Sequence, residues 1–588
     1  MYCSTSNFLG RARSHRGRSH NVTSSTYRHK REVGMVIQAV WTDGPALRDI
    51  TIGAALDEQA SLRPDAMALI LGDHRLTWGA LAARVDSLSR GLIAWGVDRG
   101  DHVAVMGPNS LPWVLLEYAL GKIGAVLVTV NPSFRAQELS YLLQQGQVST
   151  LFVASRYRQV DISAVLQTIL PDLAASDPMN GRNGDDLPDL RRVGCLGPDA
   201  LAGALPFDRL LTLADQVSPD DLARRALAVQ PDDVFQIQYT SGTTGKPKGA
   251  MLTHKGTYNN ARLMADRAGF GPDERLLSAM PFFHTAGCVC NVLGMLAVGG
   301  CLIALPDFDA GDMLAAVEDH RATVINAVPT MYLRMLDHPD LPQRDVSSFR
   351  IAFAGGTSIP PAMMRDLKER MGADPMIIMG MTECSPIITQ TDPADDFETR
   401  ISTAGKPLPH IALRIIDPDT GAPVAFGEPG ELLIQGFGVT RGYFDMPDQT
   451  AETIDADGWL RSGDLAVLAE TGHLRIVGRI KDMLIRGGEN IYPVEIEDAL
   501  LQHPDIAQAQ VIGVPDPQMG EEICAFVTPA GAARLDPEEV KDWCKATFAR
   551  HKMPRHLHVI DAMPLTANGK VQKFELRRMA AQMLEIPT

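Results

Sequence analysis

The order of apolar and polar positions predicts alternating strands and helices from about residue 46 onward. Apolar residues recur at helical spacing over 76–95, and a short apolar run at 103–106 follows as a strand. The alternation is clearest between residues 301 and 380. There, helical stretches at 312–321 and 361–371 separate strand-like runs at 301–306, 323–329, 350–356 and 376–380. Strands that alternate with helices of this length predict βαβ crossovers and a parallel sheet covered on both faces.

The pattern changes twice farther along the chain. Residues 171–233 are rich in Pro, Gly and Asp and predict a surface excursion. Strand-like segments dominate 411–478, which indicates a β-rich lobe. After Arg479 the pattern is that of a small α+β unit, with helices expected near 493–502 and 536–549 and strands near 508–513 and 523–528.

These patterns predict an α/β fold in two domains. The large N-terminal domain, residues 46–479, is expected to combine doubly wound, mostly parallel sheets with the β-rich lobe. The C-terminal domain, residues 480–588, is expected to be a small, mobile α+β unit. Residues 1–45 form a basic tail outside the fold. A chain of 588 residues is long enough for this division, because a single hydrophobic core stops growing beyond roughly 250–300 residues.

Composition and charge exclude several classes of protein. A formal net charge of −16 argues against general nucleic-acid binding. The sequence has no apolar run of the roughly 18 residues that a membrane-spanning helix needs. Its eight cysteines form no CxxC pair and no cysteine–histidine metal spacing. They are interpreted as reduced, mostly buried thiols, which favours a cytoplasmic location.

The N-terminal segment leaves an alternative for the location. Residues 1–34 contain six arginines and Lys30, together with many serines, and Glu32 is their only acid. This composition is typical of a transit peptide that directs a protein to an organelle. A disordered tail, or a true start at Met35, is the other interpretation, because no amphipathic helix is evident there.

A donor-rich loop, YTSGTTGKPKG, occupies residues 239–249. Its glycines let backbone N–H groups approach a ligand without interference from Cβ atoms. Its hydroxyl groups and lysines add donors and positive charge, so the loop is interpreted as a polyphosphate cradle. Its spacing does not match the Walker A pattern GxxxxGK[ST]. The expected ligand contacts are Thr240, Ser241, Gly242, Thr243, Thr244, Gly245, Lys246 and Lys248.

Two glycine-rich turns follow predicted strands, GGTS at 355–358 and GMTE at 380–383. Ligands of open parallel sheets bind beyond the carboxyl ends of the strands. The turns are therefore site candidates, with Gly355, Gly356, Met379, Gly380 and Met381 as expected nucleotide contacts.

The donor-rich loop resembles the phosphate-loop signature of the acyl-adenylate-forming enzymes, the superfamily of acyl-CoA synthetases, luciferases and peptide-synthetase adenylation domains. The resemblance covers nearly all of residues 50–585, because further family motifs follow in the expected order. They are PFFHTAG (281–287), AGGTSIP (354–360), MGMTE (379–383), GWLRSGD (458–464), GRIKDMLIRGGENIYPVEIE (478–497) and PLTANGK (564–570).

The resemblance implies an ATP-dependent acyl-CoA ligase, in which RCOOH + ATP + CoA gives acyl-CoA + AMP + PPi, with Mg²⁺ as the metal ion. The segments MGEEICAF (519–526) and KVQKFELR (570–577), with the long motif at 478–497, are most similar to medium-chain fatty acyl-CoA synthetases. The implied partners are therefore a carboxylic acid, ATP and CoA, with a homodimer as an open alternative.

Each motif implies roles for its polar residues. By resemblance, Thr382 contacts the α-phosphate, and Glu383 holds Mg²⁺. Asp464 accepts both ribose hydroxyls, and Arg479 is a second ribose contact. Lys570 would reach the carboxylate oxygen and the α-phosphate during adenylation, where a placed cation stabilises the transition state.

The remaining motifs imply a hinge, a channel and an acyl pocket. Lys481 stands where the family has its hinge, and Gly487 and Gly488 would line a narrow channel for the pantetheine thiol. His284 resembles the histidine beside the acyl pocket, which Thr285, Cys288, Gly355 and Gly356 would line. That pocket contains no obvious ion-pairing residue, which favours a hydrophobic acid over an amino acid.

Met379 departs from the family pattern, which usually has a tyrosine stacked on adenine at this position. A thioether also packs on an aromatic face, so we expect ATP to bind with altered affinity. Three alternatives remain open at this point: a ligase that loads a carrier protein, a luciferase-type oxidation, and a catalytically silent nucleotide-binding regulator.

Overall fold

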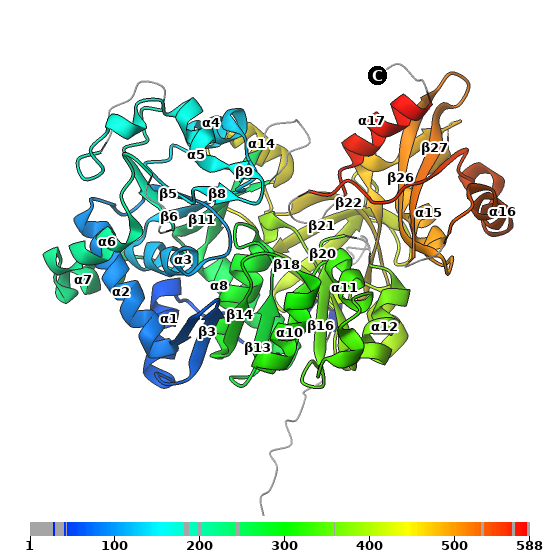
Figure 1. The fold of residues 1–588 in the computed structure, drawn as a ribbon. Helices are drawn as coiled ribbons and strands as arrows, with labels where there is room; N and C mark the ends of the chain where they lie inside the picture. The colour runs from blue at the N-terminus through cyan, green and yellow to red at the C-terminus, as the bar shows by residue number, and fades with distance from the viewer. Residues whose placement is uncertain are drawn as a thin grey trace, which may run out of the picture.

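The computed structural model describes residues 27–29, 40–42, 44–181, 187–197, 201–240, 247–357, 359–487, 489–530, 534–566 and 571–584. Its strands form two large α/β sheets, a third antiparallel sheet, a smaller C-terminal sheet and a two-stranded pair of β8 (Arg156–Tyr157) and β9 (Val160–Asp161) (Figure 1). Within these residues no helix has the length and apolar character needed to cross a bilayer. The seven cysteines among them are free and buried, as expected.

The first sheet has six strands and is parallel except for its last pair. Its order is β10 (Arg192–Cys195), β7 (Thr150–Val153), β5 (His102–Met106), β6 (Val126–Val130), β11 (Val234–Thr240) and β12 (Lys248–Thr253). Every residue of β6 is buried, as expected for a strand covered on both faces. The helices of this half are α2 (Trp78–Ala94), α3 (Leu111–Ile123), α4 (Ala136–Gln145), α5 (Ile162–Ile169), α6 (Phe207–Leu213) and α7 (Pro219–Ala228).

The second sheet has nine strands and is parallel from β17 to β3. Its order is β19 (Lys406–Pro407), β18 (Ile387–Gln390), β17 (Asp374–Gly380), β16 (Ile351–Gly355), β15 (Val324–Ala327), β13 (Arg275–Ser278), β14 (Cys301–Ala304), β3 (Met67–Leu71) and β4 (His74–Thr77). The accompanying helices are α1 (Ile52–Leu62), α9 (Gly294–Val298), α10 (Ala310–His320), α11 (Pro329–Leu336), α12 (Pro361–Met371) and α13 (Phe397–Ser402), with a π-helix at Ala286–Leu293.

Helix α8 (His254–Arg267) connects these two sheets. It contacts β12 of the first and β18 of the second, and most of its residues are buried. Four of the buried ones are polar, and each forms side-chain hydrogen bonds: His254, Thr257, Asn259 and Asn260. Such a helix lacks the exposed polar stripe of a surface helix and fixes the separation of the two sheets.

The third sheet and the C-terminal unit complete the chain. The third sheet contains β1 (Tyr27–His29), β2 (Val40–Thr42), β20 (Ile411–Ile416), β21 (Pro429–Gly436), β22 (Leu460–Leu468) and β23 (Leu474–Arg479), and α14 (Pro447–Thr453) precedes β22. The C-terminal unit, orange to red in Figure 1, pairs β24 (Leu484–Arg486), β25 (Glu489–Ile491), β26 (Ile506–Asp516), β27 (Gly520–Pro529) and β28 (His556–Val559), with helices α15 (Pro493–Leu500), α16 (Pro537–Thr547) and α17 (Lys573–Met583).

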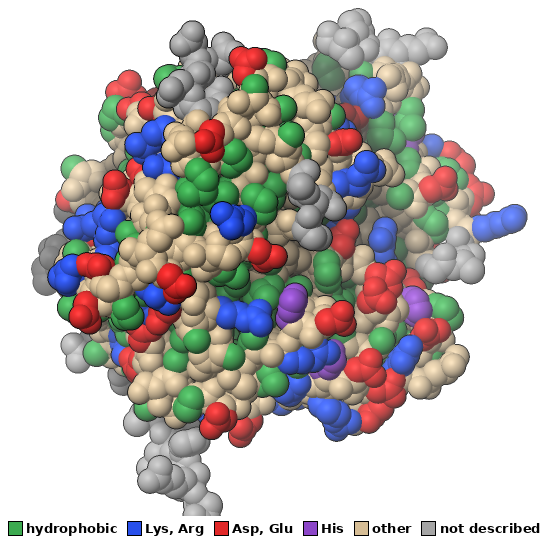
Figure 2. Space-filling view, turned by 60° about the vertical axis from the view of Figure 1, so that its left-hand side comes forward, with side chains coloured by type: hydrophobic (Ala, Val, Ile, Leu, Met, Phe, Trp, Pro, Cys, Tyr) green, Lys and Arg blue, Asp and Glu red, His purple; other side chains and the backbone are tan. Residues whose placement is uncertain are grey.

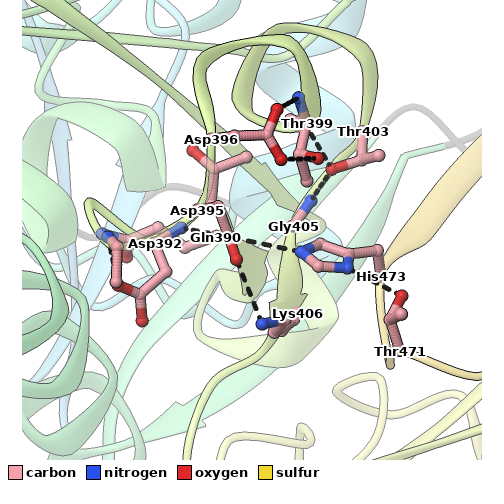
Figure 3. Close-up of polar contacts among 12 residues, drawn as sticks. Gln390, Asp392, Asp395, Asp396, Thr399, Thr403, Gly405, Lys406, Thr471 and His473 are labelled. Atoms are coloured by element: carbon pink, nitrogen blue, oxygen red, sulfur yellow. Dashed lines mark hydrogen bonds and ion pairs between the residues drawn. The ribbon is translucent and has the colours of Figure 1, made fainter.

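A partly buried polar cluster joins the second sheet to the third (Figure 3). His473 Nε2 lies 3.1 Å from Asp395 Oδ2, and Lys406 Nζ donates to Asp395 Oδ1 at 3.1 Å. Burial alone would raise the pKa of Asp395, but the hydrogen bonds from His473 and Lys406 outweigh it and lower the pKa. His473 belongs to the turn between β22 and β23, so the cluster ties that hairpin to the edge strand β19.

The predicted fold class is confirmed, and so are the alternation from 301 to 380 and the β-rich segment after 411. The expected helix at 361–371 coincides with α12, which has Pro361 in its first turn and ends at Gly372 in the left-handed region, with φ of +74°. The basic tail expected outside the fold contributes β1 and β2 to the third sheet, where β2 pairs with β20. The boundary at residue 480 stays a prediction.

The surface excursion expected at 171–233 is partly wrong. Strand β10 pairs with β7 in the first sheet, and Leu210 of α6 is fully buried. Helix α6 lies so close to α2 that a Cβ at Gly91 would stand 2.1 Å from the Leu210 carbonyl oxygen. The Pro, Gly and Asp residues between these elements obscured their apolar faces.

Acidic and basic side chains are interspersed on the face shown in Figure 2, without a continuous basic stripe there. A surface of this kind keeps the local potential small despite the net charge of −16. A strong anion site must then depend on donors gathered locally.

His254 leads to a prediction about stability and pH. Its side chain is fully buried at the start of α8, and burial lowers its pKa to about 3, although Asp233 partly opposes the shift. A histidine with a lowered pKa takes up a proton on unfolding, so its contribution to stability is complete above pH 6.5 and is lost as the pH falls towards 3. We expect the unfolding free energy of the wild type to fall by up to about 1.4 kcal/mol more per pH unit in this window than that of His254→Gln.

The measurement is urea unfolding of both proteins at about pH 7.5 and about pH 5, followed by tryptophan fluorescence. Only the difference in slope is informative, because the substitution itself changes stability. Parallel pH profiles for the two proteins would contradict the neutral state of His254 in the fold.

Candidate active site

Three strand ends come together at one edge of the large α/β region. Strand β11 ends at Thr240, β16 at Gly355 and β17 at Gly380. The Thr240 hydroxyl donates to Glu383 Oε1 at 3.5 Å, a long hydrogen bond that brings the stem of the donor-rich loop to the GMTE turn. Residues 241–246 lie outside the described residues, but Lys248 on the other side of the loop is described. The two motifs therefore belong to one site.

Glu383 is the buried acid of this site. Its side chain is only 7% exposed, and the Tyr443 hydroxyl donates to Oε1 at 2.9 Å. Burial, followed by the adjacent negative charge of Glu383, raises the pKa of Tyr443, so the phenol stays protonated and remains a donor. The backbone N–H of Thr440 also donates to the Glu383 carbonyl oxygen at 2.7 Å. One carboxylate oxygen is thus held by two hydroxyl groups.

The turn that carries Glu383 is fixed by a helix far away in the sequence. Thr382–Cys384 forms a short 3₁₀ helix, and Ser385 follows with a left-handed φ of +70°. The Asn260 amide of α8 donates to the carbonyl oxygen of Ile387 at 2.7 Å and accepts from its N–H at 2.9 Å. A Cβ at Gly380 would stand 2.2 Å from the Pro386 carbonyl oxygen, so no other residue fits there without displacing the turn.

Positive charge lies close to the buried acid. Lys248 Nζ is 4.9 Å from the ring centroid of Tyr443, the same ring whose hydroxyl binds Glu383. A cation over the face of an aromatic ring is attracted by the ring's quadrupole. The ammonium group therefore stands beside the junction of Thr240, Glu383 and Tyr443, where it supplies a charge suited to an anionic ligand.

A second carboxylate is held on the third sheet. Asp464 and Arg479 are paired residues of β22 and β23, and Arg479 Nε lies 2.7 Å from Asp464 Oδ1. Asp464 is buried, whereas half of the Arg479 side chain is exposed. The Asp464 N–H donates to the Ser462 hydroxyl at 3.0 Å. A buried carboxylate with a half-exposed arginine beside it is suited to binding vicinal hydroxyl groups.

The segment after Arg479 joins the third sheet to the C-terminal unit. Ile480–Asp482 is a 3₁₀ turn in which Lys481 is exposed. Asp482 lies 3.4 Å from Lys573 Nζ of α17. Gly487 has a left-handed φ of +59° directly after β24, whereas Gly488 and Lys570 lie outside the described residues.

The PFFHTAG segment leads into the π-helix. The His284 ring Nδ1 accepts from the Ala286 N–H at 3.1 Å, and Thr285 is buried. Cys288 is fully buried against Gln238, whose amide lies 3.2 Å from the sulfur, and burial holds the pKa of the thiol well above its usual range. Cys288 thus lies beneath the surface of any cavity here.

The remaining glycines and Met379 lie at the ends of β16 and β17. A Cβ at Gly355 would stand 2.5 Å from the Ile378 carbonyl oxygen, and Gly356 has a left-handed φ of +86°. Met379 and Met381 are partly buried and pack against the main hydrophobic core. Met379 thus has its thioether at the edge of the core, next to the strand ends.

Comparison with known proteins decides the family. The model of the AMP-binding enzyme family matches residues 56–444, and the model of its C-terminal domain matches residues 495–570. The chain belongs to the AMP-binding enzyme family.

Relatives of this AMP-binding enzyme extend over nearly the whole chain. The putative acyl-CoA synthetase YngI of Bacillus subtilis (strain 168) is 40% identical over 541 residues, 91% of this chain and 98% of the relative. The mitochondrial medium-chain acyl-CoA ligase ACSF2 of Mus musculus is 34% identical over 550 residues, 92% of this chain and 89% of the relative. The expectation of an AMP-forming acyl-CoA ligase is therefore confirmed.

Solved structures confirm the fold class of the AMP-binding enzyme. The anthranilate CoA ligase AuaEII in complex with anthranoyl-AMP has a TM-score of 0.81 at 26% identity, covering 92% of this chain and 98% of its own. ATP-bound MatB from Rhodopseudomonas palustris has a TM-score of 0.78 at 28% identity, covering 91% and 100%.

Sequence reasoning missed Tyr443 and Asn260 of the AMP-binding enzyme. Tyr443 lies 60 residues from its partner Glu383, and Asn260 lies 127 residues from Ile387. Neither lies in a segment whose composition indicates a ligand. No signal singled out Asn260, because α8 contains other polar residues that are also buried, Thr257 and Asn259 among them, and every buried amide must find partners.

The Tyr443–Glu383 hydrogen bond leads to a second prediction. We expect Tyr443→Phe to lower ATP–pyrophosphate exchange about tenfold or more and to raise the Mg²⁺ concentration needed for half-maximal rate. The reason is that a hydrogen bond to a charged group contributes about 1.5–3 kcal/mol. Exchange is measured as a function of Mg²⁺ concentration at saturating ATP.

Tyr332→Phe is the matched control, because the Tyr332 hydroxyl is fully buried and binds only the carbonyl oxygens of Ile325 and Phe353. It should lower thermal stability and leave the magnesium requirement unchanged. If Tyr443→Phe also left that requirement unchanged, Glu383 would not be the residue that responds to the ion.

Proposed function

We propose that this acyl-CoA ligase activates a hydrophobic carboxylic acid, and a medium-chain fatty acid is the first candidate. The acid's carboxylate attacks the α-phosphorus of ATP, pyrophosphate leaves, and the thiol of CoA then displaces AMP from the acyl-AMP. The observation that carries this proposal is the junction of Thr240, Glu383 and Tyr443, which places a buried carboxylate beside the stem of the donor-rich loop.

The residues of this junction fit Mg²⁺. Glu383 presents carboxylate oxygen, and Thr240 adds a hydroxyl oxygen. No group of three or more His, Cys, Asp or Glu side chains that could enclose a metal ion occurs in the part of the chain that the structure describes. One carboxylate suits an ion that keeps several waters and takes its other ligands from phosphate oxygens. When bound, the ion neutralises charge on the phosphates.

The chain's own residues supply binding and orientation. Asp464 would accept the ribose hydroxyls, with Arg479 beside it, and Thr382 would donate to the α-phosphate. Lys246 and Lys248 would neutralise the outer phosphates, and the loop's N–H groups and hydroxyls would hold their oxygens. A site assembled in advance costs no reorganisation when charge develops on the α-phosphate.

Lys570 would supply the positive charge at the reacting centre. The residues on either side of the segment that carries it are held by hydrogen bonds. Leu565 and Val571 pair across it, and the Gln572 N–H donates to the Pro564 carbonyl oxygen at 2.8 Å. A rotation of the C-terminal unit about Lys481 would withdraw this cation from the reacting centre. The same rotation would bring Gly487 and Gly488 towards the acyl carbon. The two half-reactions would then use opposite faces of one small domain.

The choice of a medium-chain fatty acid rests on the relatives named as medium-chain acyl-CoA ligases and on the apolar surroundings of His284. An aromatic acid is the second candidate, because the solved neighbour AuaEII contains an anthranoyl adenylate. We propose a cytoplasmic location, with an organelle as the alternative because several relatives are named mitochondrial.

The deciding experiment is an AMP-release assay with straight-chain acids from acetate to stearate and with benzoates, each with and without CoA. We expect the highest rate with a medium-chain acid, AMP release that depends on CoA, and an acyl-CoA product identified by its mass. Acyl-AMP that forms but never passes to CoA would indicate another acceptor, and nucleotide binding without any turnover would support a silent regulator.

Lys570 gives a third prediction. We expect Lys570→Ala to reduce acyl-AMP formation about 10²-fold or more, because a placed cation stabilises the transition state more than the ground state. Transfer from preformed acyl-AMP to CoA should change far less. Lys545→Ala, which removes an exposed lysine of the same unit, is the control. ATP–pyrophosphate exchange at the wild-type rate in Lys570→Ala would reject this role.

A further inference from the structure

Arg486 and Glu522 form a buried ion pair in the C-terminal unit. Arg486 Nε donates to Oε2 of Glu522 at 2.8 Å, and Nη2 donates to Oε1 at 3.0 Å. The Glu522 side chain is 2% exposed and that of Arg486 is 17% exposed. Two parallel N–H···O bonds fix the guanidinium plane as well as its distance, which a single ammonium group does not achieve.

The pair belongs to a wider attachment of residues 485–487 to strand β27 and the turn before it. The Ile485 N–H donates to Glu521 Oε2 at 2.8 Å, and the Gly487 N–H donates to the Met519 carbonyl oxygen at 2.8 Å. Arg486 is also the register partner of Gly520 across the two strands. Three consecutive residues are thus held from one side, immediately before Gly488.

Other charges strengthen the attachment at Glu522. Arg555 Nη1 lies 3.5 Å from Glu522 Oε1 and donates to Asp516 Oδ2 at 3.1 Å. Arg486 also donates through Nη1 to the His551 carbonyl oxygen at 2.9 Å. A buried carboxylate needs such partners, because an ion left unpaired in the interior is strongly destabilising. The cluster therefore links β24, β27 and the segment from His551 to Arg555.

We propose that the Arg486–Glu522 pair is a positioning device for the thioester-forming step. It holds the backbone at Arg486 and Gly487 in the position that the approach of the CoA thiol to the acyl carbon requires. It does not touch the substrates and has little effect on adenylation, which uses the opposite face of the unit. The inference rests on the proposed role of Gly487 and Gly488. A misplacement of about 1 Å at a reacting centre costs about 10²-fold in rate.

The test separates the two half-reactions in the purified, full-length protein. Acyl-AMP formation is measured by pyrophosphate release without CoA, and thioester formation by mixing preformed enzyme-bound acyl-AMP with CoA. We expect Glu522→Gln to slow the second step about 10–100-fold and the first step less than about threefold. Arg486→Lys, which keeps the charge and loses the fork, should show the same selectivity, and it provides the test if Glu522→Gln does not fold.

Glu274→Gln is the matched control. It breaks one arginine–glutamate contact, with Arg350, just before β13 and β16 of the second sheet, where Glu274 also accepts from the Thr323 hydroxyl at 2.6 Å. This variant should leave the ratio of the two half-reaction rates at the wild-type value. A merely structural role for the Arg486–Glu522 pair would lower both rates together, or lower thermal stability alone.

The failure of this inference differs from a failure of the proposed function. If the wild type transfers its acyl group to CoA and both variants keep the wild-type ratio, the positioning role is wrong and the ligase activity stands. If the wild type forms acyl-AMP but no thioester, the proposed acceptor and the positioning role both fall. Selective loss of the second step in both variants supports the proposal.

Discussion

Burying the carboxylate of Glu383 is the constraint on which the site depends. A carboxylate removed from water is costly unless hydrogen-bond donors or cations surround it. Here the donors come from separate parts of the fold, Thr240 at the end of the first sheet and Tyr443 from the segment before α14. The acid can be accommodated only when these parts have docked. Assembly of the site and assembly of the large α/β region are therefore one event.

Helix α8 makes that docking reproducible. It lies between the two α/β sheets with most of its residues buried, so it cannot shift without disturbing both. Its Asn260 side chain satisfies both backbone groups of Ile387, just beyond the Glu383 turn. A buried amide with all of its bonds made permits only one geometry. The helix thus transmits the rigidity of the two cores to a short turn that Thr440 and Tyr443 hold from its other side.

Prediction from sequence succeeded where the signal is local. The alternation over residues 301–380 and the boundaries of α12 follow from periodicity and from Pro361 and Gly372. The motif residues Thr240, Glu383, Asp464 and Arg479 were found from resemblance, and the structure brings the first two together and pairs the last two. Their roles remain predictions. The partners Tyr443 and Asn260 were missed because tertiary contacts across 60 and 127 residues leave no local trace.

The distribution of charge pairs supports the proposed hinge after Arg479. Before the 3₁₀ turn, Arg479 pairs with the buried Asp464 across β22 and β23, so both partners belong to the third sheet. After the turn, Arg486 is held by the buried Glu522, a pair that is costly to break. Asp482 is already tied to Lys573 of α17. A rotation about Ile480 and Lys481 would therefore leave the first pair in the third sheet and carry the other two with the C-terminal unit, so the unit would move as one body.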